Sequence, residues 1–166
     1  MGMREIVLIA HNIRSTHNVG SLLRTAEGLG VKTVYLTGYT PFPLKQSDPR
    51  LPHLVKKVDK QISKTALGAE QLVNWQHEES VNQVIKILKA DGFSVCALEQ
   101  TAESVNLTKF ETPEKVAILV GREVEGIEPE VLRLCDKVLE IPMFGKKESF
   151  NVAQAAAMAM FYCRFG

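Results

Sequence analysis

The sequence predicts an α/β fold with a mostly parallel sheet flanked by helices. A strand is predicted over residues 5–10 from its continuous aliphatic run, and it is followed by a helical pattern of apolar residues from Val19 to Leu29 and by a second predicted strand over 31–36. This strand–helix–strand order is typical of parallel sheets, and unbroken apolar runs are typical of their buried strands. Strands and helices keep alternating to the C-terminus without a linker, repeat or low-complexity tract. We therefore expect residues 1–166 to form a single domain.

The first helix has recognisable ends. Apolar residues recur at helical spacing from Val19 to Leu29, with Asn18 placed as the N-cap and Gly30 as the C-terminal cap. Downstream we expect a helix over 81–89, strands over 93–98 and 116–120, a short helix over 128–134 and a strand over 138–141. Residues 38–66 are broken by prolines and are predicted to form a less regular connection.

The last third of the chain has the pattern of a ligand site. An aliphatic strand stops at Pro142, a polar turn with a glycine follows over 144–148, and Ser149 is placed to cap a helix that begins at Phe150. That helix carries almost no charge, so it should be buried on most faces. Open α/β sheets bind ligands at turns of this kind, where a strand ends and a helix begins.

Composition and motifs exclude several classes of protein. The cysteines, Cys96, Cys135 and Cys163, are odd in number and widely spaced, so we expect reduced thiols in a cytoplasmic protein instead of a disulfide framework or a zinc site. The N-terminal apolar run is too short for a signal peptide or a membrane span. Neither G-x-G-x-x-G nor G-x-x-x-x-G-K-[ST] is present, which argues against common nucleotide folds.

A basic segment stands out in a chain whose formal net charge is only +1. Over residues 45–64 its acidic residues are Asp48 and Asp59, and its basic residues are Lys45, Arg50, Lys56, Lys57, Lys60 and Lys64. A solvated face is the usual explanation of such a run, and phosphate contact by a functional loop is the alternative.

Three polar clusters follow a strand or open a helix. They contain Asn18 and Arg24, then Glu123 between two glycines, then Ser149 and Asn151. Each has a plain structural explanation by itself: a solvated helix residue, a loop charge and a helix cap. Together they form an ordered set that suggests one site.

The set resembles the motifs of the SpoU-type (TrmH-like) RNA 2′-O-ribose methyltransferases of the SPOUT, or α/β-knot, superfamily. Asn18, Gly20 and Arg24 match its motif N-x-G-x-x-x-R, and the second motif, G-x-E-x-x-G, is matched by Gly121, Glu123 and Gly126. The third motif is matched by Ile141, Pro142, Met143, Gly145, Ser149, Phe150, Asn151 and Val152. The resemblance covers essentially the whole chain.

The resemblance implies a deep trefoil knot formed by the C-terminal segment, an S-adenosylmethionine site inside it, and a homodimer. Pattern rules alone would have excluded a knot. The cofactor would be held by backbone at Gly121, Ile141 and Phe150, with Leu98, Leu119 and Met143 adding to the pocket. The substrate would be tRNA or rRNA, and the basic segment is the expected RNA contact. We expect no metal, no membrane and no separate RNA-binding domain.

The implied reaction is attack of a ribose 2′-oxygen on the sulfonium methyl group. We expect Arg24 to grip the target phosphate and ribose, because a guanidinium normally stays charged, while a phosphate or a water accepts the proton. Asn18, Ser149 and Asn151 are expected to orient the ribose and hold Arg24. Glu123 is expected to fix Arg24 or its own loop.

Two other functions stay open at this point. One is methylation of a base nitrogen by the same fold. The other is a non-catalytic module of the same fold that binds RNA or senses the cofactor, against which the intact polar motifs argue.

Overall fold

The computed structural model describes residues 2–166, in which seven strands form one sheet of order β3-β2-β1-β6-β4-β7-β5. All neighbouring strands are parallel, which confirms the predicted fold class. The elements are β1 (Glu5–His11), α1 (Thr16–Gly28), β2 (Thr33–Thr37), α2 (Pro52–Ala66), β3 (Trp75–Glu78), α3 (Val81–Ala90), β4 (Ser94–Leu98), β5 (Val105–Asn106), β6 (Lys115–Val120), α4 (Pro129–Leu132), β7 (Lys137–Glu140) and α5 (Val152–Phe165). Short 3-10 turns occupy Ala69–Gln71 and Leu107–Lys109.

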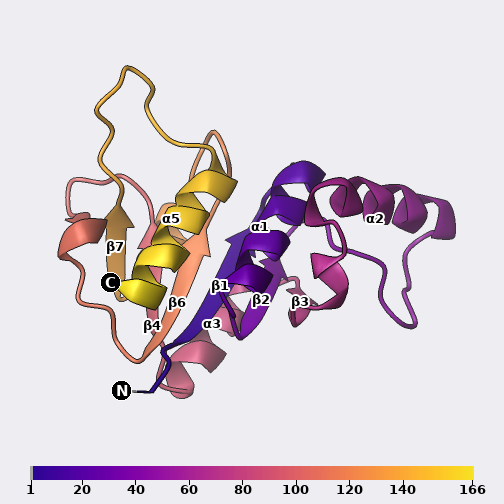
Figure 1. Cartoon of the computed structure of the whole chain (residues 1–166), viewed down its shortest axis with the longest axis horizontal. Helices are drawn as coiled ribbons and strands as arrows, with labels where there is room; N and C mark the ends of the chain where they lie inside the picture. The colour runs from indigo at the N-terminus through magenta and orange to yellow at the C-terminus, as the bar shows by residue number, and fades with distance from the viewer. Residues whose placement is uncertain (1) are drawn as a thin grey trace.

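Helices cover both faces of the sheet, so its central strands are buried on both sides. Figure 1 shows α1 and α5 side by side on the near face and α3 behind the sheet. In β1, Ile6 and Leu8 pack under α1 and α5, whereas Val7 and Ile9 pack with α3 on the other face. Because side chains alternate along a strand, a strand covered on both faces must be apolar throughout, as residues 6–10 are.

The sheet changes direction between β1 and β6. From β1 the order runs through β2 to β3, and from β6 it runs through β4 and β7 to β5. Ala10 and Val120 are register partners near the carboxyl ends of these two strands. Ligands of open parallel sheets bind at the carboxyl ends beside such a switch point. The fold therefore places the β1–α1 connection and the loop after β6 at one potential site.

The prediction of an irregular connection over 38–66 is wrong for its second half. Residues 52–66 form α2, with Pro52 in the first turn, where its missing N–H breaks no helical bond. Val55, Ile62 and Ala66 form its buried stripe. Gly20 of α1 faces this helix, and a Cβ atom there would collide with Thr65 and the carbonyl of Ile62. The glycine of the first motif therefore serves close packing of α1 on α2.

Two short edge strands were not predicted. β3 alternates half-buried and exposed residues, and β5 is only two residues long, so neither has the apolar run of a buried strand. The other predicted elements agree with the structure to within a few residues at each end. Cys96 and Cys163 are buried free thiols, as expected, and Cys135 is half-buried.

The C-terminal segment leaves β7 as a long loop, gold at the upper left of Figure 1, and returns as α5 beside α1. This path is consistent with the implied knot, which stays a prediction. Within residues 2–166 no helix is both long and apolar enough to cross a bilayer.

Candidate functional site

The site is built around the carboxylate of Glu123, in the loop that follows β6. The loop closes on itself, because the Gly126 N–H donates to the Arg122 carbonyl (3.1 Å) and Arg122 Nε donates to the Gly126 carbonyl (3.0 Å). Glu123 then accepts hydrogen bonds from the backbone N–H of Arg14 (3.4 Å) and of Ser15 (3.3 Å). The second motif is thereby tied to the β1–α1 connection.

Two asparagines extend this network to the start of α5. Asn18 Nδ2 donates to Glu123 Oε1 (3.3 Å), and Asn151 Nδ2 donates to Asn18 Oδ1 (3.2 Å). Residues from all three motifs thus form one hydrogen-bonded chain, in which Asn18 is more than a hundred positions from each of its two partners. The structure brings Asn18, Glu123 and Asn151 together, as the sequence predicted for one site.

The two predicted helix N-caps are wrong by two or three residues. Ser15 caps α1 by accepting from the N–H of Asn18, and Asn151 caps α5 by accepting from the N–H groups of Ala153 and Gln154. The N-cap positions predicted for Asn18 and Ser149 are therefore corrections. A cap of this kind is worth about 1 kcal/mol to a helix. Because Asn151 uses its oxygen as the cap, its amide nitrogen is oriented toward Asn18.

Arg24 does not join the network. It is exposed on α1, and within residues 2–166 its guanidinium forms no hydrogen bond or ion pair. Six residues of α-helix separate it from Asn18 by about 9 Å along the axis and by roughly 120° around it. The expectation that Asn18, Ser149, Asn151 or Glu123 holds Arg24 within one chain is therefore not met.

A cavity lies directly beside the network, at the carboxyl ends of β4, β6 and β7. Four of the predicted cofactor residues line it, namely Leu98, Gly121, Ile141 and Phe150, together with Ser149 and Glu123 from the catalytic set. Leu119 instead lies fully buried in the core below α3, and Met143 is half-buried outside the lining. Sequence reasoning missed the other lining residues: Glu99, Gln100, Val120, Arg122, Val124, Gly126, Leu139, Glu140, Val152 and Ala155.

The lining combines apolar walls with carboxylates. Glu99 is fixed by the N–H groups of Gln100 (3.0 Å) and Ile127 (3.1 Å), and Glu140 accepts from the Ser104 hydroxyl (2.7 Å). Gly126 has φ +73° and a Cβ atom there would collide with Glu99, so this turn requires glycine. A cavity with these walls suits an organic ligand that carries positive charge.

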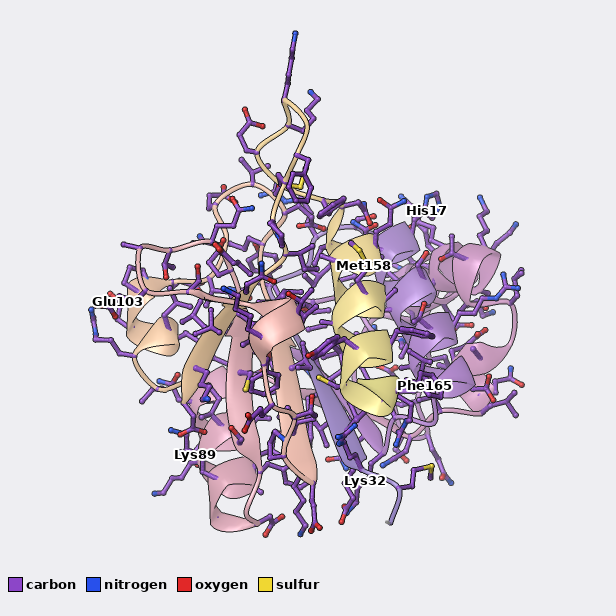
Figure 2. All side chains as sticks on the ribbon, turned by 60° about the vertical axis from the view of Figure 1, so that its left-hand side comes forward. His17, Lys32, Lys89, Glu103, Met158 and Phe165 are labelled. Atoms are coloured by element: carbon purple, nitrogen blue, oxygen red, sulfur yellow. The ribbon has the colours of Figure 1, made fainter. Side chains whose placement is uncertain are left out.

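The loop between β7 and α5 stands away from the body of the protein. Figure 2 shows it rising above the rest of the molecule. Phe144 in this loop is 98% exposed, and Phe150, where the loop returns to the cavity, is 37% exposed. The loop thus leaves the cavity open on the side of Phe150.

A second polar cluster, between the end of β1 and the loop after β6, was not predicted. His11, at the end of β1, is buried, with Nδ1 2.9 Å from Thr37 Oγ1 and Nε2 3.4 Å from Glu128 Oε2. Asn12 Nδ2 donates to Glu128 Oε1 (3.1 Å). The cluster fastens the end of the Arg122–Gly126 loop to β1. The only sequence signal was a histidine and an asparagine directly after a buried strand.

Burial lowers the pKa of His11, and the nearby Glu128 carboxylate only partly opposes this effect. Burial acts to raise the pKa of Glu128, but hydrogen bonds from its own backbone and from Asn12, with the charges of His11 and Arg122, hold that pKa below its ordinary value. Near neutral pH the pair is therefore a neutral imidazole beside a carboxylate, with Nε2–H facing Glu128.

The basic segment divides into a bound arginine and free lysines. Arg50 pairs with Asp48 at 2.6 Å, donates to the carbonyls of Phe42 and Pro43, and holds the pKa of Asp48 well below its usual range. Asp59 accepts from the N–H of Leu44 (2.8 Å). The exposed lysines are Lys45, Lys56, Lys57, Lys60 and Lys64, and the last four lie on α2. Arg50 is therefore a structural residue of the loop.

The lowered pKa of His11 predicts a pH dependence of stability. The unfolded chain takes up the proton at the ordinary pKa of 6.5, before the folded chain does, so this group costs stability as the pH falls through that value. Urea unfolding at about pH 7.5 and about pH 5.5 should show a smaller acid loss for His11→Gln than for the wild type. Equal losses in the two proteins would contradict the assignment of His11 as a buried neutral group.

Comparison with known proteins places the chain in a family. It matches the SpoU rRNA Methylase family over residues 5–161. A tRNA (guanosine(18)-2′-O)-methyltransferase of Borreliella burgdorferi is 28% identical over 158 residues, which are 94% of this chain and 64% of that protein. This chain thus spans under two thirds of that relative's length.

Solved structures have the same fold. An AdoMet-bound rRNA methyltransferase from Sinorhizobium meliloti has a TM-score of 0.80 at 22% identity, covering 98% of this chain and 57% of that one. A structure reported for the 2-OH methylation of C/U34 on tRNA has a TM-score of 0.79 at 25% identity, covering 98% of this chain and 95% of that one. With the family match spanning nearly every residue, this chain belongs to the SpoU rRNA Methylase family.

Proposed function

We propose that this protein transfers the methyl group of S-adenosylmethionine to a ribose 2′-hydroxyl of RNA. The observation that carries the proposal is the hydrogen-bonded chain Glu123–Asn18–Asn151, which lies beside a carboxylate-lined cavity at the carboxyl ends of β4, β6 and β7. Membership of the SpoU rRNA Methylase family and the names of the relatives support it. We place the activity in the cytoplasm, where RNA substrates of this kind occur.

The residues of the cavity fit the cofactor. S-adenosylmethionine carries a sulfonium and an ammonium group, and Glu99, Glu123 and Glu140 supply negative charge around apolar walls. Leu98, Gly121, Ile141 and Phe150 would hold it, with Val152 and Ala155 of α5 closing one side. When bound, the cofactor supplies an electrophilic methyl group that needs no further activation.

The remaining work of the chain is orientation of the ribose. Ser149 lines the cavity, and Asn18 and Asn151 lie beside it with amide groups already fixed by Glu123 and by the cap of α5. Holding reactants in the correct geometry can supply several kcal/mol of rate acceleration. Arg24, exposed and charged, serves as a phosphate contact outside this network.

We propose tRNA as the substrate. A structure reported for 2-OH methylation of C/U34 on tRNA is similar in length to this chain, which covers 95% of it. A ribose in an anticodon loop is accessible without unwinding a helix.

We also propose that the protein is a homodimer that pairs through the outer face of α5. Met158, Phe161 and Phe165 are exposed along this helix, and an apolar groove between α1 and α5 is lined by Leu29, Ala157 and Tyr162 among others. Figure 2 marks Met158 and Phe165 on the helix. Arg24 is next to Thr25, which lines that groove, so a second copy seated there lies close to Arg24. A solution mass of one chain would contradict the dimer.

The lysines of α2 are the proposed RNA contact. Lys56, Lys60 and Lys64 recur every four residues and so form one stripe, and Figure 1 shows α2 standing out from the sheet. Each phosphate contact removed should lower the slope of log affinity against log salt by about one. We expect Lys56→Gln with Lys60→Gln to reduce the slope for tRNA by about two, and Lys86→Gln on α3 to leave it unchanged. A slope unaffected by the double change would exclude α2 from the interface.

The proposed activity predicts a matched pair of variants on α5. Ala155→Leu puts a side chain into the cavity, whereas Gln154→Leu adds the same side chain on the exposed surface. Calorimetry should show S-adenosylmethionine affinity lowered at least about tenfold by the first change and unchanged by the second, because about 1.4 kcal/mol of lost contact is sufficient.

The reaction product identifies the chemistry. After incubation of wild-type protein with labelled cofactor and unmodified tRNA, nucleoside analysis should find a 2′-O-methylated residue. A methylated base nitrogen would replace the proposal with the base methyltransferase, and cofactor binding without transfer to any RNA would support the non-catalytic module.

A further inference from the structure

A second hollow lies on the other side of Glu123. Its lining includes Arg14, Ser15, Asn18, Tyr39, Glu123 and Glu125. Glu123 and Val124 also line the cofactor cavity, so these two residues form the wall between the two spaces. A group bound in the hollow is therefore a direct neighbour of a group bound in the cavity.

The backbone of Tyr39 is held in place beside this hollow, and its side chain is exposed. Its N–H donates to Asn12 Oδ1 (3.0 Å). Asn12 (φ +54°), directly after β1, and Gly38 (φ +63°), directly after β2, both have left-handed backbone that turns the chain at these strand ends. The next residue, Thr40, donates through its hydroxyl to the Ala10 carbonyl (2.9 Å) and accepts from the N–H of Ile13 (3.0 Å). The turn is thus fixed to the connection that also holds Glu123.

The phenol ring of Tyr39 lacks an aromatic neighbour. It is 55% exposed, and within residues 2–166 its ring is not stacked on another aromatic side chain. An exposed aromatic ring has only two χ angles, so it loses little conformational freedom when a flat ligand stacks on it. Nucleobases are flat, and each presents a π-face irrespective of its sequence identity.

One cationic side chain, that of Arg14, lines the hollow together with the carboxylates of Glu123 and Glu125. Arg14 is exposed, and only its backbone N–H is hydrogen-bonded among the residues the structure describes. Its guanidinium is therefore available to a phosphate, for which arginine offers two parallel donors. Ser15 and Asn18 line the same space and carry a hydroxyl and an amide group.

We propose that this hollow binds the target nucleotide of the RNA, with its base stacked on Tyr39 and its phosphate paired with Arg14. The inference rests on the proposed function and deepens it, because it assigns the substrate a place across Glu123 from the cofactor. Stacking does not read base identity, so Tyr39 contributes affinity for an unpaired nucleotide of any base.

The test uses the full chain and three variants of one residue. Tyr39→Ala removes the ring, while Tyr39→Phe and Tyr39→Trp keep a stacking surface. Leu44→Ala, in the same β2–α2 connection, is the control for loss of an exposed apolar side chain. Binding of a labelled anticodon stem–loop RNA is measured without cofactor, and kcat and KM for methyl transfer are measured with it.

Removal of the ring should weaken stem–loop binding, and raise the KM for RNA, by about 5- to 150-fold, the range reported for loss of one base stack. Tyr39→Phe and Tyr39→Trp should remain within about threefold of the wild type, as should Leu44→Ala. The affinity for S-adenosylmethionine and the midpoint of thermal unfolding should be the same in all variants.

The outcomes separate this inference from the proposed function. If Tyr39→Ala changes neither RNA binding nor methyl transfer, the inference about the hollow is overturned and the proposed function is unaffected. RNA binding that depends on Tyr39, in a wild-type protein that transfers no methyl group, supports the hollow and overturns the function. Loss of RNA binding in Tyr39→Phe and Tyr39→Trp as well as Tyr39→Ala contradicts stacking.

Discussion

The whole site depends on how the carboxylate of Glu123 is held. Its oxygens accept bonds from two backbone N–H groups of the β1–α1 connection and from the amide of Asn18. These bonds join the loop after β6 to the start of α1, and Asn151 extends the connection to the start of α5. The network is only partly buried, so its specificity comes from the geometry of several bonds that share one carboxylate. Glu123 also forms, with Val124, the wall between the carboxylate-lined cavity and the hollow at Tyr39.

Apolar periodicity was sufficient to predict the sheet and its main helices. The strands at its centre are covered on both faces, so their sequences are apolar without interruption. Apolar periodicity did not predict the elements that are only partly buried. β3 and β5 lie toward the edges and have no apolar run. For α2, prolines in the preceding loop concealed a helix whose buried stripe contains only Val55, Ile62 and Ala66. Pro52 in the first turn is compatible with the beginning of that helix, but prolines in this segment also predict an irregular connection.

Motif order predicted which residues meet, but not their roles. Asn18, Glu123 and Asn151 come together. Arg24, which belongs to the same motif as Asn18, lies about 120° from Asn18 around the axis of α1 and faces solvent. Leu119 was expected in the pocket, but alternation along β6 directs it into the core. His11 and Glu128 could not be paired from sequence, because their contact depends on how the loop after β6 folds back onto β1. Charge counting likewise could not separate Arg50, bound to Asp48, from the free lysines of α2.

A double-mutant cycle on Glu123 and Asn18 tests the central claim most directly. If the two side chains act as one unit, Glu123→Ala with Asn18→Ala should lose little more methyl transfer than the more damaging single change, with a coupling energy of about 0.5–3 kcal/mol. Asn18→Ala paired with Glu130→Ala, an exposed carboxylate of α4, supplies the control and should be additive. If the losses of methyl transfer in the Glu123 and Asn18 single variants add up to the loss in the double variant, as in the control pair, the account is contradicted.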